Sequence, residues 1–154
     1  ELIATKDRSE VNYVNDIFRT ASVWIRNGNG DVLLAQRKWD KKVDPGKWGE
    51  AIGGTVEGDD SYLLTAKREA AEELGLENTE LTLGPKQLVR GDATYFVQWY
   101  SALLDLPVES IAFQEEEVLA VQWFHVDQLK ADIIEHPERY IHGMQDMFTL
   151  LETA

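Results

Sequence analysis

Cysteine is absent from the 154-residue chain, which excludes disulfide bonds, thiolate metal sites and a cysteine nucleophile. Long apolar runs are also missing, because no stretch approaches the roughly 20 residues that a membrane-spanning helix needs. The first residues, ELIATKDRSE, lack the charged and apolar pattern of a signal peptide. These absences fit a cytoplasmic protein without a membrane partner.

Positive charge is scarce: 15 Lys and Arg stand against 28 Asp and Glu, for a formal net charge of −13. A surface this acidic repels phosphate backbones, which argues against binding of a nucleic-acid polymer. A small phosphorylated ligand is not excluded, but it needs local cations, most simply metal ions. Hydrophobic residues make up 44% of the chain, and no repeat or linker interrupts them, which predicts one domain over residues 1–154.

Strand signals dominate the first two thirds of the chain. Apolar and β-branched segments predict strands at 20–27, 31–38, 48–56, 81–90, 93–104 and 118–126. The first two flank the turn sequence GNGD and predict a hairpin. The tail 127–153 is helical in composition, and Pro137 divides it. Strands and helices mix without regular βαβ alternation, which favours a mixed sheet with helices on its faces.

The clearest helix is SYLLTAKREAAEELG, residues 61–75. Acidic and hydroxyl side chains just before it offer N-caps, and Gly75 stands where a C-cap glycine belongs. The apolar side chains of its expected core face are Leu63, Leu64, Ala70, Ala71 and Leu74.

Three carboxylates of this helix, Glu69, Glu72 and Glu73, share an arc of about 100°. Each like-charge pair among them opposes the helix by roughly 0.2–0.5 kcal/mol. A solvated acidic face explains the cluster, and so does a site for Mg²⁺ or Mn²⁺, which prefer carboxylate oxygens. The preceding glycines in GGTVEGDD, residues 53–60, favour the cation site, since glycine lets main-chain atoms approach a metal or phosphate closely.

The segment GTVEGDDSYLLTAKREAAEELGL, residues 54–76, resembles the Nudix box. The matching residues, with their spacing, are Gly54, Arg68, Glu69, Glu72, Glu73, Gly75 and Leu76. Two positions depart from the pattern, because Asp60 replaces a glutamate and Ala70 replaces a bulky aliphatic residue. The resemblance extends over most of the chain. LLAQRKWDKKVDPGKW, residues 33–48, is similar to the branch that contains isopentenyl-diphosphate isomerase and related hydrolases.

The resemblance implies a Nudix-type α/β/α sandwich with a mixed β-sheet. It implies a metal-dependent hydrolase that cleaves a diphosphate linkage in a nucleoside diphosphate derivative or related small molecule, using Mg²⁺ or Mn²⁺. Glu69, Glu72 and Glu73 would be metal ligands together with the carbonyl of Gly54. Arg68 would hold a glutamate carboxylate by a charge-assisted pair. A small-molecule diphosphate is the expected partner, and a homodimer is compatible with the sequence.

The general base and the substrate contacts are less defined by the resemblance. Many members of the family take a further glutamate from a loop beyond the box, which points here to Glu116 or Glu117 in QEEEV. A solvated acidic turn explains these glutamates equally well. Arg37, Lys47 and Trp48, in the cation-bearing segment before the box, are candidates for binding the substrate.

Two alternatives accompany the hydrolase. The isomerase is disfavoured, because similar isomerases use a cysteine and a histidine where this chain has Gly53 and Thr55. A non-catalytic, Nudix-like module that binds or senses a nucleotide gains support from Asp60. The intact Arg68-Glu69 and Glu72-Glu73 pairs oppose it.

Overall fold

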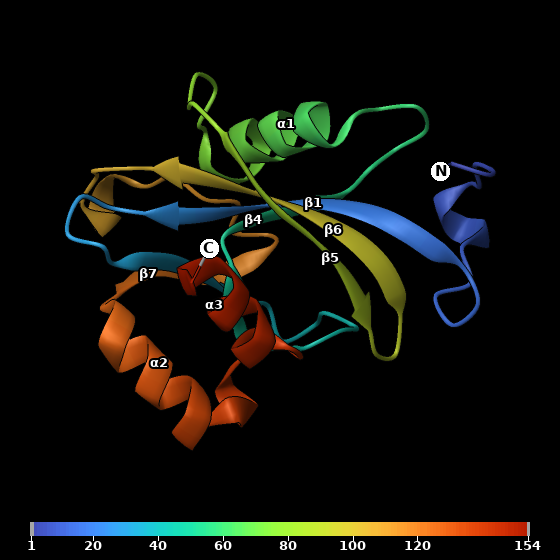
Figure 1. Ribbon diagram of the computed structural model, residues 1–154. Helices are drawn as coiled ribbons and strands as arrows, with labels where there is room; N and C mark the ends of the chain where they lie inside the picture. The colour runs from blue at the N-terminus through green and yellow to red at the C-terminus, as the bar shows by residue number, and fades with distance from the viewer. Residues whose placement is uncertain (1, 154) are drawn as a thin grey trace.

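The computed structural model describes residues 2–153 as a mixed sheet between two helical layers (Figure 1). The strands are β1 (Ile17–Arg26), β2 (Val32–Arg37), β3 (Trp48–Glu50), β4 (Ile52–Thr55), β5 (Thr82–Arg90), β6 (Thr94–Leu103) and β7 (Val118–Phe124). The α-helices are α1 (Tyr62–Leu74), α2 (Val126–Glu135) and α3 (Met144–Thr153). Short 3₁₀ turns lie at Arg8–Glu10, Val108–Ser110 and Pro137–Arg139. The predicted sandwich with a mixed sheet is confirmed.

The sheet is organised around β1 and β2. Strand β1 pairs in parallel with β6 along its whole length, and β5 follows β6 as the outer strand. The β1–β2 hairpin is confirmed, but the two strands pair only near their turn, at Ile25↔Leu33 and Arg26↔Val32. Beyond that point they separate, which leaves an edge open on each.

Strands β3 and β4 fill these two edges. β3 pairs with β2, and β4 pairs with β1. The prediction of a single strand over 48–56 is therefore wrong: Ala51 separates two short strands that belong to different neighbours. This division matters for the site, because it brings the glycines of β4 to the sheet edge beside α1.

Alternating side chains divide the core between the two faces of the sheet. On one face, Val23 and Ile25 of β1 pack with Ala70 and Leu74 of α1. On the other face, Trp24 and the hydrophobic side chains of α2 and α3 form a second cluster. Figure 1 shows α1 above the sheet and α2 and α3 below it.

Helix α1 is capped as the sequence predicts, but its buried face is different. The Ser61 hydroxyl accepts from the Leu64 N–H at 3.1 Å, and Gly75 ends the helix at φ 67°. Leu63 and Leu64 are 40% and 52% exposed, so the prediction that they face the core is wrong. The fully buried residues are Thr65, Ala66, Ala70 and Leu74. This face is centred on Glu69 and Glu73, which are thereby turned toward β4.

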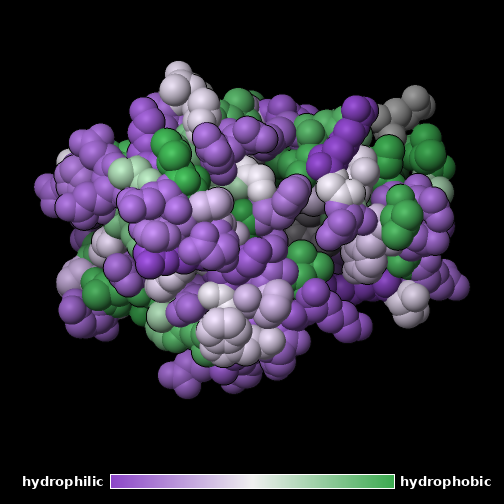
Figure 2. Space-filling view, turned by 90° about the horizontal axis from the view of Figure 1, so that it is seen from below, coloured by the Kyte–Doolittle hydropathy of each residue, from purple (hydrophilic) through white to green (hydrophobic). Residues whose placement is uncertain are grey.

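The face of the molecule opposite α1 is largely hydrophilic (Figure 2). Figure 2, which looks at the side opposite α1, shows polar and charged side chains over most of that face. Among residues 2–153, no helix is both long and apolar enough to cross a bilayer.

Candidate active site

The centre of the site is the contact between α1 and the free edge of β4. The Gly53 N–H, which points away from β1, donates to Glu73 Oε2 at 2.9 Å. One residue further, the Glu69 carboxyl group occupies the place where a Cβ of residue 54 would lie, so Gly54 cannot carry a side chain. Two carboxylates of the helix therefore rest directly on a glycine backbone.

Burial changes the acidity of both carboxylates. It raises the pKa of Glu73 to about 8, despite the opposing hydrogen bond from Gly53. It also raises the pKa of Glu69, with a further contribution from the nearby charge of Glu72. Burial thus disfavours the ionised form of both carboxyl groups, and a bound cation would favour that form.

The third carboxylate of the helix lies elsewhere. Glu72 is exposed on the solvent side of α1. Within residues 2–153, no group of three His, Cys, Asp or Glu side chains is already arranged to hold a metal ion. Coordination by Glu72 together with Glu69 and Glu73 therefore requires a change of side-chain conformation.

Arg68 binds Asp60, the aspartate that replaces a glutamate of the Nudix box. Its Nη1 donates to Asp60 Oδ2 at 2.8 Å, whereas its Nε lies 3.9 Å from Glu69 Oε1. Asp60 thus ties the loop after β4 to the helix, and the shorter aspartate reaches the arginine. The closer partner of Arg68 is this loop aspartate rather than a glutamate of the helix.

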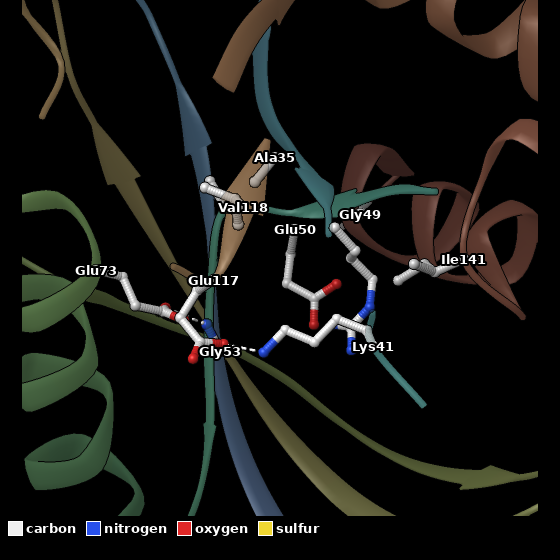
Figure 3. A pocket seen from close by; sticks show the side chains of 11 residues that line it. Ala35, Lys41, Gly49, Glu50, Gly53, Glu73, Glu117, Val118 and Ile141 are labelled. Carbon is white, nitrogen blue, oxygen red and sulfur yellow. Dashed lines mark hydrogen bonds and ion pairs between the residues drawn. The ribbon is translucent and has the colours of Figure 1, made fainter. Parts of the chain in front are cut away.

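A pocket opens beside these carboxylates. Its lining is Ala35, Arg37, Lys41, Gly49, Glu50, Ala51, Gly53, Glu73, Glu117, Val118 and Ile141. Figure 3 shows the carboxylates of Glu73 and Glu117 near Gly53, with the Lys41 amine and the Glu50 carboxylate turned toward the same space. Three acidic and two basic side chains therefore converge from five segments of the chain.

Glu50 was not among the residues expected from the sequence. Its carboxylate lies over β1, where the Ser22 hydroxyl donates to Oε1 at 3.4 Å, and burial raises its pKa. The sequence contained a sign of its importance, because Glu50 is the one charged residue in the strand sequence WGEAIGGT. A charge within a buried strand needs a partner or a function.

Of the candidate bases, the structure brings only Glu117 into the pocket. Glu117 forms an ion pair with Lys41, which reaches it from the loop after β2. Glu116 is exposed and does not line the pocket. The structure distinguishes these neighbouring glutamates by the direction of their side chains. The sequence EEE alone does not distinguish them.

The candidate substrate residues are similarly divided. Arg37 lines the pocket, and its Nε donates to the Val43 carbonyl at 3.0 Å. Lys47 pairs with Asp44 at 3.4 Å and lies outside the pocket lining. Trp48 packs edge-on against Phe124, with ring centroids 5.1 Å apart, on the α2–α3 side of the sheet.

Comparison with known proteins identifies the family of the chain. The family model described as the NUDIX domain matches residues 16–144. Nudix hydrolase 3 of Arabidopsis thaliana is 28% identical over 149 residues, which cover 89% of this chain and 19% of that protein. The uncharacterized Nudix hydrolase YfcD of Salmonella typhi is 27% identical over 85% of this chain and 70% of its own.

The fold agrees with these relatives. The crystal structure of DR0079 from Deinococcus radiodurans matches with a TM-score of 0.75 and 19% identity, over 86% of this chain and 81% of its own. The chain spans about a fifth of the Arabidopsis protein, which therefore contains much more than this domain. With a family match over most of its length and the corresponding fold, this chain belongs to the Nudix family of hydrolases.

Proposed function

We propose that this protein hydrolyses the diphosphate linkage of a nucleoside diphosphate derivative, using Mg²⁺ or Mn²⁺. The observation that carries the proposal is the placement of Glu69 and Glu73 on the glycine backbone of β4, beside a pocket that also holds Glu117 and Arg37. Carboxylates that can bind a metal ion, a candidate general base and a positively charged side chain that can bind phosphate thus lie close together.

The donor set fits a divalent cation in its chemistry. Glu69, Glu72, Glu73 and the Gly54 carbonyl supply only oxygen donors, as hard cations prefer. Burial raises the pKa of Glu69 and of Glu73, so the ionised forms of these ligands need stabilisation. A bound divalent cation would supply that stabilisation, screen the diphosphate and make water more acidic.

The side chains of this chain provide the remaining functions. Arg37 and Lys41 meet the phosphate oxygens at the pocket wall. Glu117 accepts a proton from the attacking water, a role for which Lys41 must first leave it. Asp60 and Arg68 hold the loop after β4 against α1 and so keep Glu69 in place. Attack of water at phosphorus gives two phosphate-containing products.

Ligands of similar structures support a nucleotide substrate. The Nudix domain of Shewanella oneidensis NrtR, complexed with ADP ribose, matches with a TM-score of 0.65 and 19% identity, over 96% of this chain and 92% of its own. A bifunctional protein from Francisella tularensis, complexed with AMP and a Mn ion, matches with a TM-score of 0.64 and 21% identity, over 90% of this chain and 42% of its own. These likenesses concern the fold, and the substrate class is our inference from them.

Isomerase activity is disfavoured despite a relative of that name. The isopentenyl-diphosphate Delta-isomerase of Roseobacter denitrificans is 29% identical over 79% of this chain and 72% of its own. Similar isomerases use a cysteine on the strand that enters the box, and this chain contains no cysteine. β4 has Gly53 there, and its backbone N–H is engaged by Glu73.

A substrate panel tests the proposal. The protein is incubated with nucleoside diphosphate sugars, dinucleoside polyphosphates and isopentenyl diphosphate, with Mg²⁺ or with chelator, and the products are identified. We expect metal-dependent release of a nucleoside monophosphate from at least one nucleotide. A nucleotide that binds tightly and is recovered unchanged would instead show a sensing module.

A further inference from the structure

Asp44 is the only residue other than glycine with positive φ among residues 2–153, at 49°. The strain is increased by its position, because the residue before a proline is restricted to extended conformations and Pro45 follows. Such strain persists only where surrounding contacts impose it, and it is concentrated at functional sites. The contacts of Asp44 therefore indicate what the conformation achieves.

Backbone contacts place Asp44 at the start of a tight turn. The Lys47 N–H donates to the Asp44 carbonyl at 3.3 Å, with Pro45 and Gly46 between them. Gly46 has φ 72°, which gives the pattern of a type II turn. The turn returns the chain to β2, where the Arg37 N–H donates to the Lys47 carbonyl at 2.9 Å.

The side chain of Asp44 binds two further groups. Its Oδ2 accepts from the His142 N–H at 3.0 Å, and its Oδ1 lies 3.4 Å from Lys47 Nζ. His142 precedes α3, next to Ile141, which lines the pocket. One carboxylate thus fastens the loop 38–47 to the segment that carries Ile141 of the pocket lining.

The loop held in this way carries the cationic wall of the pocket. Lys41 lies three residues before Asp44, and the Arg37 Nε donates to the carbonyl of the adjacent Val43 at 3.0 Å. Displacement of Asp44 would therefore move the acceptor that orients Arg37 and the backbone that carries Lys41. Weaker contacts of these two cations with the phosphates would weaken substrate binding.

We propose that Asp44 is a positioning residue, whose strained backbone and carboxylate clamp hold Arg37 and Lys41 at the pocket for the phosphates of the substrate. The proposal rests on the function proposed above. It assigns Lys47 to the clamp rather than to the substrate.

Kinetics of three Asp44 variants test the clamp. For Asp44→Ala we expect KM for a hydrolysed nucleotide to rise by about tenfold or more, with kcat changed far less, because the phosphate contacts are loosened. Asp44→Asn should restore much of the loss, since its amide oxygen still accepts from His142 and asparagine tolerates this backbone. Asp44→Gly relieves the strain but lacks the clamp, and should resemble the alanine variant. Asp40→Ala, an exposed aspartate of the same loop, is the matched control.

A double-variant cycle tests whether Asp44 acts through Arg37. If it does, Asp44→Ala should raise KM little further in an Arg37→Met background. Fully additive effects, or equal losses with Asp40→Ala, would overturn the proposal. A fall in kcat at unchanged KM would also overturn it.

Hydrogen exchange separates this proposal from the proposed function, because it requires no substrate. In Asp44→Ala, the His142 amide and the amides of loop 38–47 should exchange at least about tenfold faster than in wild type and in Asp40→Ala. Unchanged exchange would refute the clamp even if the protein hydrolyses diphosphates. Faster exchange would support the clamp even if the substrate panel gave no product.

Discussion

The acidic residues of the site differ in their surroundings, although they share one side-chain chemistry. Glu73 is partly buried against the β4 backbone, and its pKa is raised to about 8. Glu72 is exposed on the outer side of α1. Glu117 stands between these extremes, with its side chain 50% exposed at the pocket and paired with Lys41. Each of them should therefore respond differently to replacement by glutamine.

Replacement of Glu117 tests its role as the base. Glu117→Gln should lower kcat by about 100-fold or more, because glutamine cannot accept the proton of water. Glu116→Gln is the matched control, since it removes the same charge one residue away and outside the pocket lining. Steady-state kinetics with the best nucleotide of the panel make the comparison. Equal effects of the two substitutions would contradict the assignment.

Two core tryptophans offer a matched test of hydrogen bonding. Trp24 and Trp99 are each 1% exposed and meet edge to face. The Trp24 Nε1 donates to Glu152 Oε1 at 2.7 Å, whereas the Trp99 Nε1 is buried without a partner among the described residues. Trp24→Phe should therefore cost about 1–3 kcal/mol more unfolding free energy than Trp99→Phe. Urea denaturation measures both, and a larger loss for Trp99→Phe would contradict this account.

At the scale of elements, the predictable features are those encoded by neighbouring residues. The hairpin around residues 27–30, the caps of α1 at Ser61 and Gly75, and the break of the C-terminal helices at Pro137 all depend on local turn and capping chemistry. The separation of β3 from β4 depends instead on which strand each one pairs with. The sequence of residues 48–56 does not indicate these pairing partners, because the pairing follows from the divergence of β1 and β2.

The orientation of α1 could not be predicted for a related reason. Hydrophobicity favoured a core face with Leu63 and Leu64, but the helix buries smaller residues and turns the partly buried Glu69 and Glu73 toward β4. The contacts of these two carboxylates with Gly53 and Gly54 of β4 override the hydrophobic pattern here. The sequence therefore predicted the helix and its caps, but not the direction in which each side chain points.

The corner between α2 and the following 3₁₀ turn makes a pH-dependent contribution to stability. Asp132 accepts from the Tyr140 hydroxyl at 2.6 Å and from Arg139 Nη1 at 3.0 Å. These contacts hold the pKa of Asp132 below its ordinary value of 3.8, and the hydrogen bond from Tyr140 contributes most. A depressed carboxyl pKa stabilises the fold above the ordinary value, and this stabilisation is lost as pH falls through the folded value.

Asp132→Asn should therefore destabilise the protein at about pH 6 and have a smaller effect at about pH 3. Denaturant unfolding at the two pH values measures the difference, with the exposed Asp127→Asn on the same helix as control. A cost that is independent of pH would show that the carboxylate charge contributes nothing at this corner.

The whole molecule is strongly acidic, and the pocket places two cationic side chains among three acidic ones. The net charge of −13 repels an anionic substrate, while Arg37 and Lys41 stand at the pocket wall. The box residues could be predicted because their spacing is fixed along one helix and its preceding loop. Glu50 and the pairing of Lys41 with Glu117 could not, because they join segments that only the folded sheet brings together.

We infer that the carboxylates of α1 beside β4 bind the divalent cation of a hydrolase. Mn²⁺ binding, followed by electron paramagnetic resonance of the free ion, tests it most directly and needs no substrate. We expect Glu69→Gln and Glu73→Gln each to weaken Mn²⁺ binding by about tenfold or more, while Glu77→Gln, an exposed glutamate just after the helix, binds as wild type does. Unchanged Mn²⁺ affinity in both variants would contradict the claim.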